Sequence, residues 1–248
     1  LQLVRMPDYV DGASDGEEEE EDLCSDSTDG VEESLSQIET DTGCGLKERL
    51  KNIDDLISCF GPRHAKDNQE QYELFYDLCR KGNLEAVKFC IENSSDTETK
   101  QFIEWNENAG KLFPLLRCLI AQETDVAKVL IDEHKRLNER FLCECDVTGY
   151  NALMWSSQFG YLEIVEQLLP IYIKYEKVTS KLNKYSMSAL HMSAAHGHTS
   201  IVQILVEHFK KENKIEAKSK YGKNAMDIAI EKKHEDIVNI LNEALNGD

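Results

Sequence analysis

The chain has 248 residues, of which 41% are hydrophobic, and a formal net charge of −19. This length and composition are sufficient for one or two domains with a buried core. The negative charge disfavours binding to nucleic acids and to anionic membranes, because both need basic protein surfaces. The most apolar run, LFPLLRCLIA, is too short to span a bilayer and contains Arg117. We therefore expect neither nucleic acid nor membrane among the partners.

Residues 1–45 contain fifteen acidic side chains and one basic side chain, so most of the net charge lies there. The segment is also poor in aromatic residues and buries too little apolar surface to offset the entropy of ordering. It is predicted to be a disordered acidic tail. Ser14 and Ser36 each precede a glutamate by three residues, a spacing typical of acidophilic kinase sites, and are candidate phosphorylation sites. One alternative is a plain solvated tail that aids solubility. Another is a tail that folds back and competes with a partner for Lys184, Lys220 and Lys223.

Residues 46–61 are predicted to form an amphipathic helix that ends at Gly61-Pro62. One helical face collects its apolar residues, which are Leu46, Leu50, Ile53, Ile57 and Phe60. This helix is expected to cap the open apolar end of the following repeats. The alternative is a helix that pairs with another chain.

From about residue 70 onward the sequence repeats. Leu153 is followed after 3, 7, 11 and 15 residues by Ser156, Gly160, Ile164 and Leu168. The same offsets recur from five markers spaced 40, 38, 37 and 36 residues apart, which are Phe75, Leu115, Leu153, Leu190 and Met226. Repeats of this length indicate a solenoid in which neighbouring units bury one another's apolar faces.

Each unit is predicted to be a pair of helices separated by a turn at offset seven. A glycine there adopts the left-handed conformation that closes the first helix. Gln122 and Lys233 replace this glycine in the second and fifth units. The five predicted units lie near 70–93, 106–135, 146–170, 183–210 and 219–245.

This pattern resembles the ankyrin repeat, whose signature includes T-P-L-H-x-A and a glycine before the second helix. The best match is SALHMSAAHGHTSIVQILV, with Ser188–His191 at the TPLH position. DVTGYNALMWSS carries the D-x-x-G finger as Asp146 and Gly149, and YGKNAMDIAI keeps the finger glycine as Gly222. The resemblance implies an all-α solenoid of about five helix pairs over 70–248, with short β-hairpin-like fingers. The spacings exceed the family period of 33, and the surplus is expected between a second helix and the next finger, as in 170–181.

The resemblance implies a monomeric binding module without catalytic residues, cofactors or metal, whose concave face of fingers and first helices binds a protein. The partner-binding residues carried over are Val147, Tyr150, Phe159, Lys184, Tyr185, Met187, His196, Tyr221 and Lys223. Three adjacent fingers are thereby expected to present a tyrosine each, and tyrosine is favoured in binding hot spots. The alternative is that these rings pack against neighbouring fingers. Trp155 is predicted to be a core residue.

Two other classes of function remain open. Besides a scaffold, the chain could serve as a regulatory segment of a larger enzyme such as a protein kinase. It could also serve as an inhibitor controlled by phosphorylation of the tail. Deleting residues 1–45 should change partner affinity if the chain is an inhibitor and leave it unchanged if the chain is a scaffold. The cysteines mostly fall inside apolar helical patterns, which suits a reducing cytoplasmic or nuclear compartment.

Two motifs suggest chemistry but lack its context. GASDG, at 12–16, matches the nucleophile-elbow pattern, yet glutamates follow it instead of a helix. The C-x-C of Cys143 and Cys145 is not a metal-site spacing.

Overall fold

The computed structural model describes residues 68–106, 112–175 and 181–246, which belong to one compact unit, Asn52–Asp248. The predicted tail, with Ser14 and Ser36, and the predicted capping helix at 46–61 lie outside the described residues. The described ranges contain α-helices, one 3-10 helix and no strand. None of these helices is long and apolar enough to cross a membrane.

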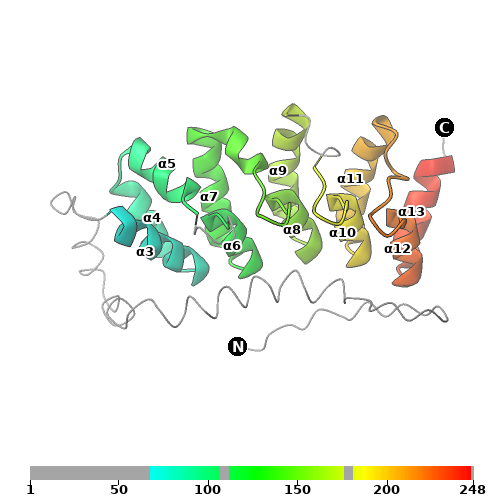
Figure 1. Cartoon of the computed structure of the whole chain (residues 1–248), viewed down its shortest axis with the longest axis horizontal. Coiled ribbons are helices and arrows are strands. Elements are labelled where there is room, and N and C mark those ends of the chain that lie inside the picture. Colours follow the sequence, from blue (N-terminus) through cyan, green and yellow to red (C-terminus); the bar gives the residue numbers. More distant parts are fainter. Residues whose placement is uncertain (1–67, 107–111, 176–180, 247–248) are drawn as a thin grey trace. The chain divides into compact units, whose positions relative to one another are not determined.

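Five helix pairs follow one another along the unit (Figure 1). They are α3 (Asn68–Arg80) with α4 (Leu84–Glu92), α6 (Pro114–Ile120) with α7 (Thr124–Leu137), α8 (Ala152–Phe159) with α9 (Leu162–Lys174), α10 (Ala189–Ala195) with α11 (Thr199–Lys211), and α12 (Ala225–Glu231) with α13 (Glu235–Asn246). The first helices contact one another in the order α3, α6, α8, α10, α12. Among the second helices, α4 contacts α7, and α11 contacts both α9 and α13. The predicted all-α solenoid of five pairs is confirmed.

The core lies between the two layers of helices and follows the repeat offsets. The first four markers are at most 3% exposed. The residues fifteen positions after the markers are fully buried, and they are Cys90, Leu130, Leu168, Leu205 and Leu241. Met226 is the exception: it is only half-buried, in the last of the first helices. The register inferred from the repeat is therefore the register of the core.

Two short elements account for the two longest spacings and were not predicted. Helix α5 (Asp96–Glu104) packs against α3, α6 and α7, and its Phe102 ring stacks on Phe75 at 5.4 Å. The 3-10 helix η1 (Glu139–Cys143) packs against both α7 and α9. There the hydroxyl of Tyr172 donates to the Leu142 carbonyl over 2.7 Å. The surplus residues of these two units thus form packed structure.

The surplus in the third unit lies partly inside its second helix. Helix α9 continues past Pro170 to Lys174, and Ile171 and Tyr172 are buried. The expectation that 170–181 lies wholly between a helix and the next finger is therefore wrong. Burial of these two apolar side chains outweighs the one backbone hydrogen bond that Pro170 cannot donate.

The turns within the pairs have the predicted left-handed conformation. Gly160 has a φ of 79° and is the C-cap residue of α8, where its N–H donates to Ser156 O. The non-glycine residues Gln122 and Lys233 adopt the same conformation, with φ of 65° and 61°. The helix-pair interpretation therefore holds also where the glycine is missing.

Candidate functional site: the finger face

Three five-residue turns of the same geometry precede α8, α10 and α12. We call 146–150, 183–187 and 219–223 the first, second and third fingers. In each, the first residue donates its N–H to the carbonyl of the fifth, over 2.8 to 3.0 Å, and accepts from the N–H of the fourth. The fourth residue has positive φ in all three, including Ser186 at 58°. The fingers are thus hydrogen-bonded turns, with one β-bridge, Cys145 to Asn151, beside the first.

A side chain at the first position holds two of these turns closed. Asp146 Oδ1 accepts from the N–H groups of Thr148 and Tyr150 over 2.8 and 3.0 Å. Asn183 Oδ1 accepts in the same way from Tyr185 and Met187 over 3.0 and 2.9 Å. Burial raises the pKa of Asp146, and the hydrogen bonds to its carboxylate oppose that shift. An amide at Asn183 provides the same acceptor without burying a charge.

Neighbouring fingers are joined through their backbones. The N–H of Lys184 donates to Thr148 O over 2.8 Å, and the N–H of Lys220 donates to Tyr185 O over 2.8 Å. Each finger therefore holds the next at a fixed register. Side chains on the fingers are presented in a pre-organised row.

The second and third positions of the fingers are exposed or, at Thr148 and Tyr185, half-buried. We call these six residues the finger face: Val147, Thr148, Lys184, Tyr185, Lys220 and Tyr221. Val147 is 58% exposed and Tyr221 is 45% exposed. The Lys184 Nζ atom lies 4.9 Å from the Tyr185 ring centroid, and the rings of Tyr185 and Tyr221 are 6.2 Å apart. Aromatic, apolar and cationic groups therefore share one surface.

The expectation of three aligned tyrosines on this surface is wrong. Tyr150 occupies the fifth finger position, whereas Tyr185 and Tyr221 occupy the third. The Tyr150 side chain is only 6% exposed and stacks on Trp155 at 4.6 Å between ring centroids. Its hydroxyl lies 3.9 Å from Met192 Sδ, in the next repeat. The fifth position of the first finger thus lies in the core, and the predicted burial of Trp155 is confirmed at 3% exposure.

The remaining predicted partner-binding residues flank the finger face. Met187 and Lys223 also occupy fifth finger positions and are half-buried, and Lys223 pairs with Glu231 at 3.1 Å. Phe159 is half-buried, with its ring 5.7 Å from that of Trp155. His196 Nδ1 lies 3.0 Å from Met192 O, and burial lowers the pKa of this imidazole. Of the predicted set, only Val147, Lys184, Tyr185 and Tyr221 lie on the finger face.

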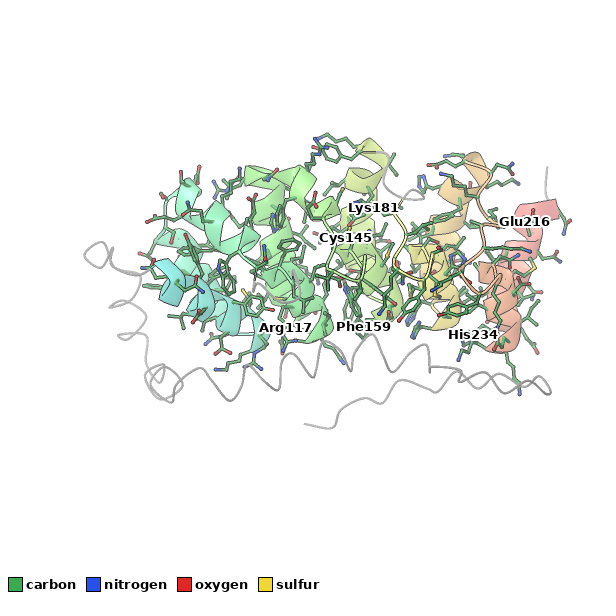
Figure 2. All side chains as sticks on the ribbon, in the orientation of Figure 1. Arg117, Cys145, Phe159, Lys181, Glu216 and His234 are labelled. Atoms are coloured by element: carbon green, nitrogen blue, oxygen red, sulfur yellow. The ribbon has the colours of Figure 1, made fainter. Side chains whose placement is uncertain are left out.

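Residues eight positions after the markers link each of the last three pairs to the preceding one. His198 Nε2 lies 2.9 Å from Gln158 O, and His234 Nε2 lies 3.3 Å from Ala195 O. The Tyr161 hydroxyl similarly donates to Leu119 O over 3.3 Å. In Figure 2, Phe159 and His234 mark the edge of the unit where the turns within the pairs lie. In the sequence, the feature that indicates these contacts is a polar side chain that recurs eight residues after each marker.

The histidines and cysteines near the fingers have structural partners. His191 Nδ1 lies 2.8 Å from Ser188 Oγ, and its Nε2 lies 3.0 Å from Ala217 O. Cys145 accepts from Lys181 Nζ over 3.4 Å, a pair labelled in Figure 2. Cys143 is buried. Within 68–106, 112–175 and 181–246, no group of three or more histidine, cysteine or acidic side chains is placed to hold a metal ion.

Comparison with known proteins identifies the family. The model described as ankyrin repeats (3 copies) matches residues 75–181 and 173–247, which together cover well over half of the chain. A search of curated proteins found no match. The helix pairs, the turns at offset seven and the linked fingers agree with the family match. The chain belongs to the ankyrin-repeat family, whose members generally serve as protein–protein interaction modules.

Proposed function

We propose that the chain is a scaffold or adaptor that binds a partner protein through the finger face, with binding and not catalysis as its activity. The observation that carries this proposal is the row of exposed and half-buried side chains on fingers joined by backbone hydrogen bonds. Because these backbones are already fixed, a partner loses little of its binding energy to ordering them. Tyrosine adds a large contact area with few rotors.

The outer surface of the second helices differs from the finger face. Its long side chains pair with one another across neighbouring elements, as Lys128 does with Glu163 and Lys174 with Glu139. Exposed ion pairs of this kind contribute little to stability and leave few unpaired groups for a partner. The finger face, by contrast, presents two aromatic rings and Val147. We therefore place the interface at the fingers.

The test compares two sets of substitutions in the full chain. The finger variant carries Val147→Ala, Tyr185→Ala and Tyr221→Ala. The control variant carries Ile173→Ala and Leu245→Ala, which shorten two exposed apolar side chains on second helices. Each protein is immobilised, incubated with native lysate and analysed by quantitative mass spectrometry, after circular dichroism shows equal helicity.

We expect a defined set of proteins to be captured by the wild type and the control and lost by the finger variant. Capture of the same proteins by all three would refute the finger face as the interface.

A further inference from the structure

The second and third fingers are basic in a chain that is acidic overall. Together with the residues just before them, at 181–182 and 218, these fingers contain no acidic side chain and hold five lysines, which are Lys181, Lys184, Lys218, Lys220 and Lys223. The chain as a whole has a net charge of −19. The first finger has no lysine, and its one acidic residue, Asp146, is buried. Positive charge is therefore concentrated on two adjacent fingers.

Three of these lysines have no carboxylate partner among the described residues. Lys184, Lys218 and Lys220 are exposed, and none forms an ion pair within 68–106, 112–175 and 181–246. Lys184 Nζ instead lies over the ring of Tyr185. Their charges are thus available to a ligand, whereas lysines on the second helices are largely paired within the chain.

The rings of Tyr185 and Tyr221 add apolar contact surface beside these charges. Lys184 and Lys220 both occupy the second position of their fingers, and the hydrogen bond from Lys220 N–H to Tyr185 O makes these two fingers neighbours. The rings of Tyr185 and Tyr221 lie 6.2 Å apart with an interplanar angle of 35°. This arrangement complements a segment that carries carboxylates and one apolar side chain.

Building on the proposed function, we infer that the second and third fingers select an acidic peptide segment of the partner protein. Its carboxylates pair with Lys184 and Lys220, and an apolar side chain contacts Tyr185 and Tyr221. A nucleic acid is a poorer match, because binding to a phosphate backbone draws on a more extended basic surface.

The first experiment measures fluorescence anisotropy of the full chain with two labelled probes. One probe is a twelve-residue peptide of glutamate and aspartate with a central phenylalanine. The other has glutamine and asparagine in place of the acidic residues. We expect the acidic probe to bind at least about tenfold more tightly at low salt and to weaken as sodium chloride is raised, because exposed charges are screened. Equal binding of the two probes, or no binding of the acidic one, would overturn the inference.

The second experiment compares two double substitutions that change the net charge equally. The finger pair is Lys184→Glu with Lys220→Glu. The control pair is Lys100→Glu with Lys211→Glu, at exposed lysines of α5 and α11. We expect at least about tenfold weaker binding of the acidic probe for the finger pair and less than about threefold for the control pair. Equal losses would show that the overall charge, and not the fingers, governs binding, and would overturn the inference.

Two further outcomes separate this inference from the proposed function. If the acidic probe fails to bind while the captured partners still depend on Val147, Tyr185 and Tyr221, the acidic specificity is wrong and the finger-face interface stands. If a single-stranded oligonucleotide binds more tightly than the acidic probe and depends on Lys184 and Lys220, the ligand is a nucleic acid and the inference is overturned.

Discussion

At the scale of single residues, His134 is the most unusual polar group in the described core. Its imidazole is fully buried on α7 and stacks on Phe141 with 5.2 Å between ring centroids. Neither ring nitrogen has a hydrogen-bond partner among the described residues. Burial lowers the pKa of His134 to about 3, because the apolar surroundings disfavour the charged form. The native state therefore holds a neutral imidazole that an unfolded chain would protonate near pH 6.5.

This burial predicts a loss of stability in mild acid. A basic group with a lowered native pKa leaves stability intact above its unfolded pKa, near 6.5, and reduces it as the pH falls from there toward about 3. At pH 5 His134 alone should lower the free energy of unfolding by on the order of 2 kcal/mol. His191, whose pKa burial lowers to about 4, should add to the loss.

The substitution His134→Leu tests this explanation. It removes the titrating group and two unsatisfied nitrogens while keeping an apolar contact with Phe141. We expect unfolding in urea to show equal or greater stability than the wild type at pH 7.5 and a smaller loss between pH 7.5 and pH 5. An identical loss in both proteins would exclude His134 as a source of the acid sensitivity.

At the scale of elements, the turn that closes each first helix is under different strain in different repeats. Glycine adopts its left-handed conformation freely, whereas Gln122 and Lys233 adopt it against the preference of a side chain. At Gly160 space is also limiting, because an added Cβ would lie 2.6 Å from Cε1 of the His198 ring. The two kinds of position should therefore respond to substitution in opposite directions.

We expect Lys233→Gly to stabilise the protein by about 0.5–1 kcal/mol, because it relieves a left-handed non-glycine residue that is exposed. Gly160→Ala should instead destabilise it by more than about 1 kcal/mol, through backbone strain and displacement of His198. Urea unfolding measures both changes. Lys233→Ala is the control for Lys233→Gly, because it removes the same side chain but keeps a Cβ at the left-handed position. A destabilised Lys233→Gly variant would indicate that the side chain of Lys233 contributes more than its backbone strain removes.

At the scale of the whole array, each helix pair is stabilised by its neighbours. Leu153 is 1% exposed on α8, which contacts α6, α9 and α10. Leu241 is fully buried on α13, whose principal described neighbours are α11 and α12. Stability in such arrays depends on the interfaces between neighbouring repeats. The destabilisation caused by a lost contact should therefore reach more helices when the contact lies in an internal repeat than when it lies in the last described repeat.

We expect Leu153→Ala to lower the free energy of unfolding by about 2–5 kcal/mol, as for other large-to-small core substitutions. Amide hydrogen exchange should then accelerate across α6 to α10. In Leu241→Ala the acceleration should be confined to α12 and α13. Uniform acceleration over all helices in both variants would contradict nearest-neighbour coupling, and a change below about 1 kcal/mol for Leu153→Ala would contradict its place in the core.

The repeat offsets were enough to predict the helix pairs, the core register and the left-handed turns. They could not reveal α5 or η1, because each occurs once; for α5, the pair Ser95 and Glu98 was a local signal as a capping box. The site was harder to foresee. Tyr150 and Tyr185 both lie in fingers, at the fifth and the third position. Only the turn geometry places Tyr150 in the core and leaves Tyr185 half-buried on the finger face.

The packing of one repeat's ring against the preceding repeat's turn limits how such a chain can be recombined. His198 covers the space beside Gly160, and His234 covers the space beside Gly197. An unequal crossover between repeats would place a turn beside the side chain of a repeat that does not normally follow it. That side chain and that turn would not have been selected to pack together. The unit that must be inherited together is therefore the contact between the turns of two successive helix pairs, so duplicated repeats should keep or change both partners together.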